Sequence, residues 1–401
     1  MKILLVPSTD WTSPLVFRHR MLAKFWSDSG HEVHVLHINL NDGKASSSTE
    51  PAIVLHRVEG LHKTNDGLQN ELLHYAANGR TYWTATKRIL RSNNIDVIVS
   101  ANLLPSLWVS LLASREGIPV VYDTVDYYPD FVYRYNLGEG LSKLVRVCAT
   151  DIMVANLRMA TALVTPSASL ASYLGKTFKP AVDGKPFHVV SNGVDLSLFD
   201  PHRYESEQNV KSGAKVLNLL YVGSLEFWLD TRFIVGVASE LRKAGYRPLV
   251  TVAGTEPSYY QGRVREQLSR EARAAGLPAD SIGLKGHIPY ASIPETISRT
   301  DACLLPFRSD LLVSQFACPL KLFEYLAMGK PILSTDLGEV KRIAGTTITA
   351  TDYAAEGARE LLGQIESASR SSSEAHLSRN LAAKHDWAQL ARDFIGLLKT
   401  C

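Results

Sequence analysis

The sequence predicts an α/β protein built from two doubly wound, Rossmann-like domains, and three observations support this prediction. Short, continuous apolar segments, which are typical of strands buried in a parallel sheet, alternate along the chain with helical segments. The alternation occupies both halves of the chain and is interrupted by one polar stretch, residues 201–215. A chain of 401 residues is also too long for one ordinary hydrophobic core. We therefore expect two domains of similar size.

The first half opens with a βαβ pattern. Residues 3–6 predict a buried strand, a helix is expected to run to about Ser29 with Gly30 as its stop, and residues 32–38 predict the second strand. The later apolar segments of this half predict strands at 96–100, 117–122 and 162–165, a helix at 107–115, and a closing turn signal at 188–193.

The second half repeats the alternation after the polar stretch. Its apolar segments predict strands at 216–222, 248–253, 282–286, 302–306 and 332–335. The segments between them predict helices at 231–244 and 263–275, and two more that start near residues 294 and 320. In sheets of this kind ligands bind at the carboxyl ends of the strands, so we expect the active site in a cleft between two facing halves.

The composition narrows the class of protein. A hydrophobic share of 45% and a charged share of 21% are typical of a globular enzyme. The net charge of +3, from 43 basic and 40 acidic residues, lacks the basic excess of most nucleic-acid-binding proteins. The four cysteines are scattered, which predicts neither a disulfide framework nor a zinc site; they are Cys148, Cys303, Cys318 and Cys401.

Membrane insertion is not expected from the sequence. The apolar run at the N-terminus is too short for the apolar core of a signal peptide and has no small-residue cleavage site behind it. No stretch approaches the roughly 20 apolar residues that a bilayer-spanning helix needs. We expect a soluble, cytoplasmic protein that is at most peripheral at the inner membrane face.

The best-marked functional segment is residues 319–331. Pro319 suits the first helical position, Gly329 the stop and Pro331 the exit, so a helix is expected to open at about Leu320. The free N–H groups and positive dipole end of this helix favour a diphosphate, and Lys321 in its first turn adds a full positive charge. Such a site stabilises a diphosphate leaving group without a metal.

Glu324 lies one turn beyond Lys321 on the same helix face. A carboxylate there can accept hydrogen bonds from both hydroxyls of a ribose, so the pair has the spacing of a nucleoside diphosphate. Taken in isolation, Lys321 and Glu324 are better explained as an ordinary surface pair on a helix, and the surrounding motifs are what favour a binding site.

This segment resembles the donor-binding motif of glycosyltransferase family 4 (group 1) and its relatives of the GT-B fold. Four further segments resemble motifs of these enzymes and occur in the expected order: 191–195, 221–224, 286–289 and 301–306. The resemblance implies two Rossmann-like domains facing a cleft: an acceptor-side domain at 1–200, a donor-binding domain at 201–384, and a last helix at 385–401 that returns to the first domain. It implies a hexosyltransferase-like enzyme that uses a UDP- or GDP-linked sugar.

The resemblance also assigns roles to residues of the second half. Glu324 would hold the ribose, Lys321 the diphosphate, and the backbone near His287 and Ile288 the base, while Gly223 would permit close approach to the phosphates. The full donor-binding set that it implies is Gly223, Ser224, His287, Ile288, Pro319, Leu320, Lys321 and Glu324. Asn192 and Asp195 are expected to form and cap a turn rather than to contact the ligand.

Two departures from the family pattern limit the prediction. The acidic residue that usually contacts the transferred sugar is replaced by Phe316, eight positions before Glu324, so Ser314, Gln315 or backbone groups would have to read the sugar. Two cations usually found after the glycine loop are also absent. The loop instead ends in Trp-Leu-Asp at 228–230, which resembles a sub-branch that builds polysaccharides and natural-product glycosides.

In the first half, Asp123 and Asp126 follow a buried strand and are expected at the cleft, where either could orient an acceptor hydroxyl. An inverting transfer needs a general base, and we assign this role to Asp126 and a turn-capping role to Asp123; capping by both is the open alternative. Arg18 and His19 are candidates for contact with the acceptor or the donor phosphate, while Arg20 fits a solvated helix face better.

We expect metal-independent transfer of a sugar to a hydroxyl of a glycan, a lipid-linked saccharide or a natural product. No cofactor or metal is expected, since the nucleotide sugar is a substrate. A sugar-nucleotide epimerase of the same fold and a non-catalytic nucleotide-sugar-binding protein remain open. A dehydrogenase is disfavoured, because the first strand is not followed by Gly-x-Gly-x-x-Gly.

Overall fold

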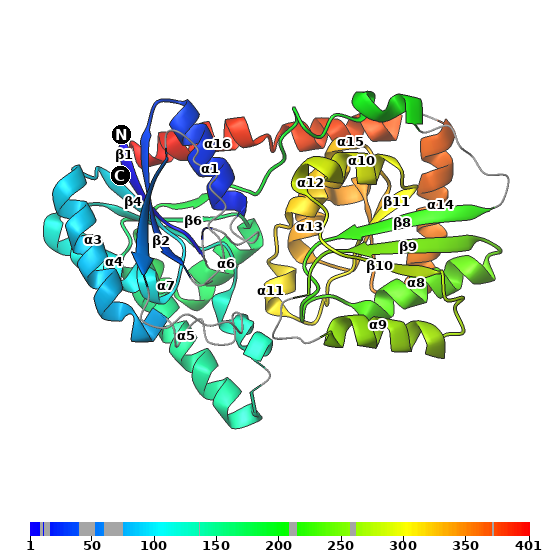
Figure 1. The fold of residues 1–401 in the computed structure, drawn as a ribbon, viewed down its shortest axis with the longest axis horizontal. Coiled ribbons are helices and arrows are strands. Elements are labelled where there is room, and N and C mark those ends of the chain that lie inside the picture. Colours follow the sequence, from blue (N-terminus) through cyan, green and yellow to red (C-terminus); the bar gives the residue numbers. More distant parts are fainter. Residues whose placement is uncertain are drawn as a thin grey trace. The chain divides into compact units, whose positions relative to one another are not determined.

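The computed structural model describes residues 1–8, 11, 17–39, 53–59, 75–135, 137–207, 215–256, 262–370 and 373–401. The chain forms two compact units: Met1–Ser191 with Trp387–Cys401, and Asn192–Asp386 (Figure 1). The boundary between the two units lies between Ser191 and Asn192, inside the turn signal at 188–193 and before the predicted boundary at residue 200. Of the predicted linker, residues 201–207 form a short 3-10 helix of the second unit, and 208–214 lie outside the described residues.

Unit 1 contains a parallel sheet whose strands follow the order β3-β2-β1-β4-β5-β6-β7. Its strands are β1 Lys2–Val6, β2 Glu32–Asn39, β3 Ile53–Glu59, β4 Val97–Ser100, β5 Val120–Asp123, β6 Ala162–Thr165 and β7 Phe187–Val189. Its α-helices are α1 Phe17–Asp28, α3 Gly79–Asn93, α4 Leu104–Glu116, α5 Glu139–Met159, α6 Ala168–Thr177, α7 Lys179–Val182 and α16 Trp387–Leu398. The central strands β4, β5 and β6 are buried at every position, as expected for a sheet covered on both faces.

Helices α3, α4 and α5 pack side by side, whereas α1 packs against α16. The Trp26 indole fixes the second pair, because it donates a hydrogen bond of 3.2 Å to the Ala391 carbonyl and lies edge-on to Phe394. Trp387 at the start of α16 is fully buried. The C-terminal helix is therefore an integral part of the unit 1 core, and Trp387 is a core residue.

Unit 2 contains a second parallel sheet in the order β10-β9-β8-β11-β12-β13. Its strands are β8 Val216–Val222, β9 Arg247–Ala253, β10 Ile282–Lys285, β11 Ala302–Leu305, β12 Ile332–Ser334 and β13 Thr349–Ala350. Its α-helices are α8 Thr231–Lys243, α9 Arg263–Ala274, α10 Ile293–Ser298, α11 Leu312–Gln315, α12 Leu320–Ala327, α13 Gly338–Ala344, α14 Ala354–Arg370 and α15 Ser373–Ala383. All five predicted strands of this half are present, and together with the parallel sheet of unit 1 they confirm the doubly wound fold class for both halves.

The sequence reading missed the strand β3 and the helix α3. β3 lies at the edge of the sheet, and its segment Ile-Val-Leu-His-Arg-Val-Glu mixes apolar and polar residues because one side of an edge strand is accessible to water. Helix α3 carries four basic residues and three threonines, so its apolar stripe is narrow in the sequence.

Candidate functional site

The segment predicted to bind the donor forms the short helix α12 of unit 2. Leu320 is its first residue, and Pro319 precedes it with φ −72° and ψ 131°, so Pro319 caps the helix rather than occupying its first position as predicted. Gly329 follows the helix with φ +64°, a left-handed conformation that favours glycine. Asn192 also contributes, because its side-chain amide donates a 2.7 Å hydrogen bond to the Cys318 carbonyl. Asn192 therefore ties the start of unit 2 to the segment that leads into α12.

Lys321 extends from the first turn of α12 across the end of β8. A Cβ atom on Gly223 would lie 2.0 Å from Lys321 Cε and 2.6 Å from Nζ, so the glycine leaves the space that the lysine fills. The Nζ atom lies 5.9 Å from the ring centroids of both Tyr221 and Phe307. Within the described part of the chain Lys321 makes no hydrogen bond and no ion pair. Burial lowers the pKa of this ammonium, while the carboxylates of Glu324 and Glu226 act in the opposite direction.

Glu324 lies one turn further along α12 and is only 5% exposed. Burial raises the pKa of its carboxyl group to about 7, and the neighbouring Lys321 charge opposes part of that rise. Its side chain accepts no hydrogen bond from the residues that the structure describes. Burial raises the pKa of the Tyr290 phenol, and the nearby Glu324 charge raises it further. The carboxylate is thus buried, close to a cation, and has hydrogen-bonding capacity left for a ligand.

The carboxyl ends of β8, β9 and β10 meet beside Lys321. Gly223 N donates to the Ala253 carbonyl, and Gly254 N donates to the carbonyls of Lys285 and Gly286. Gly254 has φ +149°, and a Cβ atom there would lie 1.7 Å from the Gly223 oxygen, so both steric space and backbone conformation require glycine. The predicted glycine loop is therefore in close contact with a second one that the sequence reading did not identify.

The other predicted donor-binding residues lie on the loops of the same strand ends. The Ser224 carbonyl accepts a 2.9 Å hydrogen bond from the Tyr221 hydroxyl, which fixes the glycine loop. After β10, His287 is exposed whereas the Ile288 side chain is buried. The structure thus brings the ends of β8 and β10 and the start of α12 together within unit 2.

The residues proposed to replace the missing sugar-reading acid differ in their availability. The Gln315 amide donates to the carbonyls of Ser309 and Asp336 and accepts from Gly338 N, so it braces two loops and has little capacity left for a sugar. The Ser314 hydroxyl is buried and has no hydrogen-bond partner in the described part of the chain. Ser314 is therefore the better candidate of the two.

The Trp-Leu-Asp motif has a structural explanation. Asp230 precedes α8, and its carboxylate accepts a 2.9 Å hydrogen bond from Phe233 N, which makes Asp230 the N-cap of that helix. The Trp228 carbonyl accepts from Arg308 N, and Asp230 N donates to the Pro306 carbonyl. The motif therefore holds the loop after β8 against the loop after β11.

Arg18, His19 and Asp123 form a buried polar cluster in unit 1. Arg18 Nε donates to Asp123 Oδ2 at 2.9 Å and Arg18 Nη1 donates to the Ser191 carbonyl at 2.9 Å. His19 Nε2 lies 3.4 Å from the same Asp123 oxygen. Although burial acts to raise it, the Arg18 charge and the His19 contact lower the pKa of Asp123 to about 2.

This cluster corrects two expectations. Asp123 is an ion-pair partner rather than a turn cap, and its carboxylate is fully buried, so it does not lie at an open edge. Arg20 does not lie on a solvated helix face, because its guanidinium donates to the Trp11 carbonyl. Asp126, by contrast, is half-buried in the bend between β5 and the next 3-10 helix.

The sequence reading missed three residues that surround Lys321: Tyr221, Phe307 and the buried Glu226. Their positions at the ends of β8 and β11 offered a partial signal, because side chains at the carboxyl ends of neighbouring parallel strands meet. Their orientation toward one lysine could not be read from that spacing.

Comparisons with known proteins agree with this geometry. Residues 19–198 match the family model described as Glycosyltransferase Family 4, and residues 217–366 match the model described as Glycosyl transferases group 1. With two doubly wound domains present, the chain is a GT-B-fold glycosyltransferase that resembles the family 4, group 1 enzymes. The class inferred from five sequence motifs is thereby confirmed.

Particular relatives refine the comparison. A protein of Bacillus subtilis (strain 168) described as a teichuronic acid biosynthesis glycosyltransferase, TuaH, is 24% identical over 216 residues, which are 52% of this chain and 49% of TuaH. The chain thus spans about half the length of that relative. Among solved structures, sucrose-phosphate synthase from Thermosynechococcus elongatus matches with a TM-score of 0.81 at 14% identity over 100% of this chain and 98% of that one. HepE from Anabaena in complex with UDP and glucose matches with a TM-score of 0.71 at 15% identity over 100% of both chains. At these identities the two structures show the shared fold alone.

Proposed function

We propose that this protein transfers a sugar from a nucleoside-diphosphate sugar, UDP- or GDP-linked, to a hydroxyl group of an acceptor, without a metal ion. The observation that carries this proposal is the pairing of the half-buried Lys321 with the buried Glu324 at the start of α12, since neither side chain makes a hydrogen bond in the described residues. A diphosphate at Lys321 and a ribose at Glu324 would use the bonding capacity of both side chains. The HepE structures contain UDP and UDP-glucose, which favours UDP as the first nucleotide to test.

The chemical step follows from this binding mode. The acceptor oxygen forms a bond to C1 of the sugar, and the bond from C1 to the diphosphate oxygen breaks with its electron pair leaving on the diphosphate. Lys321 and the backbone N–H groups at the start of α12 stabilise the charge that develops there, which is the role a metal would otherwise have. In an inverting transfer Asp126 takes the acceptor proton.

The acceptor class is part of the same proposal. We infer a glycan, a lipid-linked saccharide or a natural product with a free hydroxyl, and peripheral contact with the inner membrane face. The TuaH relative supports a role in polysaccharide formation, since its description names teichuronic acid biosynthesis. No helix of the described residues is long and apolar enough to cross a membrane.

The test combines nucleotide binding with transfer. UDP, GDP and ADP are compared by thermal shift, because a ligand that binds only the folded state raises the melting temperature with its concentration. Lys321→Ala is expected to lower sugar transfer about 100- to 1,000-fold, the usual effect of removing a group that stabilises transition-state charge. The matched control is Lys341→Ala, which removes an exposed lysine paired with Asp336.

Full transfer activity and unchanged nucleotide binding in Lys321→Ala would contradict the proposed donor site. Release of an epimerised nucleotide sugar without any acceptor would identify an epimerase instead.

Replacement of Asp126 by Asn tests the base: in an inverting enzyme transfer is lost while UDP binding stays unchanged. NMR of the product's anomeric proton identifies the stereochemical outcome.

A further inference from the structure

The outer surface of α3, α4 and α5 in unit 1 combines a row of cations with exposed apolar side chains. We propose that this surface docks onto an anionic lipid bilayer. This docking is separate from the chemistry of sugar transfer, because it involves none of the residues assigned to the donor or the acceptor. The surface of α3, α4 and α5 would make the peripheral membrane contact that belongs to the proposed function, and the inference rests on that function.

The cations lie on helix α3. Its residues Gly79–Asn93 contain no Asp or Glu, and its basic side chains are all exposed; they are Arg80, Lys87, Arg88 and Arg91. Spacings of seven and four residues place Arg80, Lys87 and Arg91 on one helix face, opposite the face that buries Tyr82, Ala85 and Ile89. In the described part of the chain none of the four forms an ion pair. Such a row, without local acids, is free to contact an extended anionic surface.

A basic row is not a general property of this protein's surface helices. Helix α9 of unit 2 also carries four arginines, but Glu266 and Glu271 lie among them. Arg265 there lies 3.9 Å from Glu256, and Arg232 of α8 lies 3.7 Å from Glu271. The four cations of α3 therefore differ from the four arginines of α9 in having no acidic residue among them.

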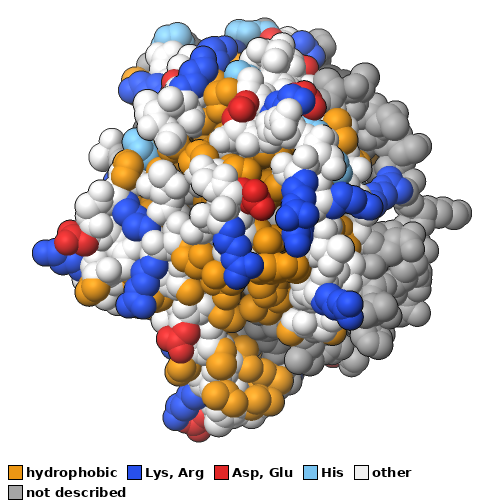
Figure 2. All heavy atoms as spheres, turned by 90° about the vertical axis from the view of Figure 1, so that its left-hand side faces the viewer, with side chains coloured by type: hydrophobic (Ala, Val, Ile, Leu, Met, Phe, Trp, Pro, Cys, Tyr) orange, Lys and Arg blue, Asp and Glu red, His pale blue; other side chains and the backbone are white. Residues whose placement is uncertain are grey.

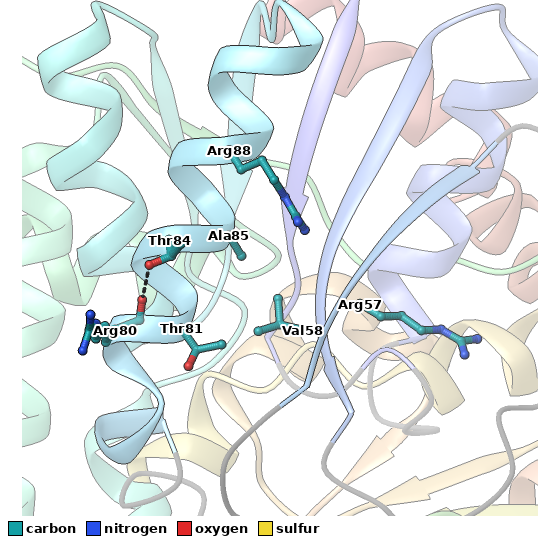
Figure 3. A pocket seen from close by; sticks show the side chains of 7 residues that line it. All are labelled: Arg57, Val58, Arg80, Thr81, Thr84, Ala85 and Arg88. Carbon is teal, nitrogen blue, oxygen red and sulfur yellow. Dashed lines mark hydrogen bonds between the residues drawn. The ribbon is translucent and has the colours of Figure 1, made fainter.

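A hollow beside this row does not suit one small anion. A cavity of about 370 Å³ lies between β3 and α3 and includes Arg57, Arg80 and Arg88 in its lining. Figure 3 shows that Arg57 and Arg80 extend to opposite sides, while Arg88 alone points toward the strands. Guanidinium groups that diverge in this way fit several phosphates spread over a surface better than a single phosphate.

The apolar part of the surface lies on α4 and α5. α4 exposes Leu111 at 40%, and Leu104, Leu107 and Trp108 beside it are partly exposed. On the first turns of α5, Leu141, Leu144 and Val147 are 51%, 59% and 57% exposed. Figure 2 shows apolar side chains gathered on this side of the unit with Lys and Arg side chains around them and few acids. Helix α4 packs against both α3 and α5, so the cations and the apolar side chains lie on adjoining helices of the unit.

An anionic bilayer is the occupant that uses both parts of this surface. Lys and Arg bind the phosphates of anionic lipids, and Leu, Val and Trp insert at the boundary between head groups and acyl chains. A soluble acidic polysaccharide would use the cations but would leave Leu144 and Val147 in water. A second copy of this chain would oppose the four cations of α3 with the same four cations if the contact were twofold symmetric.

The test is flotation of the full-length chain with vesicles of phosphatidylcholine, with and without added phosphatidylglycerol. Wild type is expected to float only with the anionic vesicles, and less at high salt. R80Q/K87Q/R91Q is expected to bind roughly a hundredfold more weakly, since each Lys or Arg near an anionic surface contributes about a factor of five. The matched control R270Q/R273Q/R359Q, which removes three exposed arginines of unit 2, is expected to bind as wild type does. L144S/V147S is expected to weaken binding at every salt concentration.

Three outcomes would overturn the proposed docking: no flotation of wild type with anionic vesicles, equal loss in the R80Q/K87Q/R91Q variant and its control, or full binding by L144S/V147S. Binding to soluble polygalacturonate that needs the α3 cations, without vesicle binding, would assign the surface to acidic polysaccharides instead. A dimer by light scattering that R80Q/K87Q/R91Q disrupts would assign it to self-association. Circular dichroism and UDP thermal shift confirm that each variant is folded, and UDP binding tests the donor site independently of flotation.

Discussion

The two units each bury a charged centre, but the two centres are constructed in opposite ways. In unit 1 Asp123 is bound by Arg18 and approached by His19, and its pKa is lowered to about 2. In unit 2 the Glu324 carboxylate accepts no hydrogen bond from the described residues, and its pKa is raised to about 7. A carboxylate whose partners are already present stabilises the fold, whereas one without partners is held at a cost that a ligand can offset. The contrast identifies the unit 2 centre as the stronger candidate for ligand binding.

Removing the Asp123 charge should have the largest effect on stability. Asp123→Asn leaves Arg18 buried without its counter-charge, so we expect a loss of about 3–5 kcal/mol in the free energy of unfolding. Because the pKa of Asp123 in the folded protein is below its ordinary value of 3.8, this stabilisation is present above that value and is lost as the pH falls toward 2. Urea denaturation at neutral pH measures the loss. The control Asp280→Asn, at an exposed pair with Arg247, should cost under about 1 kcal/mol, and equal losses would refute the contrast.

The same kind of substitution in unit 2 should act with the opposite sign. The folded-state pKa of Glu324 is above its ordinary value of 4.5, so its contribution to stability declines as the pH rises from that value through about 7. Glu324→Gln removes this cost and should stabilise the free protein by about 1–3 kcal/mol near pH 8, with little change near pH 5. Urea denaturation of wild type and variant at both pH values measures this difference in the free energy of unfolding. Destabilisation near pH 8 would show that Glu324 already has partners in the free protein.

Nucleotide affinity should depend on the protonation of Glu324. A ribose hydroxyl donates to the ionised carboxylate, so UDP binding should weaken about tenfold between about pH 8 and pH 6 as the group becomes protonated. Calorimetric titration across this range measures the slope. The nucleotide's own ionisation is controlled by Glu324→Gln, which should bind UDP more weakly and lose most of the pH dependence. An unchanged slope in that variant would remove Glu324 from the binding site.

A methyl group on Gly223 should have the smallest effect. Gly223→Ala places a Cβ atom where Lys321 Cε lies, and the flexible lysine can move away, so the cost in stability should be under about 1 kcal/mol. The displaced ammonium no longer faces the diphosphate in the same way, and UDP affinity should fall severalfold. The matched control is Gly363→Ala, where the structure leaves open space around the added atom. An unchanged UDP affinity would indicate that Lys321 moves on binding in any case.

Much of the fold could be read from local patterns. The strands β11 and β12 are buried at every position, and β8 and β9 are largely apolar, so their segments can be recognised without a structure. The start of α12 and the stop at Gly329 were marked by residues with fixed backbone preferences. The edge strand β3 and the polar helix α3 were missed, because their amphipathic sequences depend on which side meets water.

Fewer features of the candidate site could be predicted from local sequence patterns. Lys321 and Glu324 could be identified because one helical turn relates them, and a turn is a local feature. Gln315 was a plausible sugar contact in the sequence, yet its amide is used by two loops that are distant along the chain. Arg20 was assigned to solvent because the helical pattern does not show that its guanidinium reaches back to the Trp11 carbonyl, nine residues earlier.

The sequence by itself determined the class of protein, the two doubly wound domains, and the lysine and glutamate of the donor helix, because each depends on residues that are close along the chain. Only the tertiary structure decided that Asp123 is bound by Arg18, that Lys321 extends over Gly223 between Tyr221 and Phe307, and that the cations of α3 lie beside the apolar face of α4. These relations depend on which strand ends and which helices become neighbours. The physical reason is that pKa values and charge surfaces are set by distances through space, which chain order does not specify.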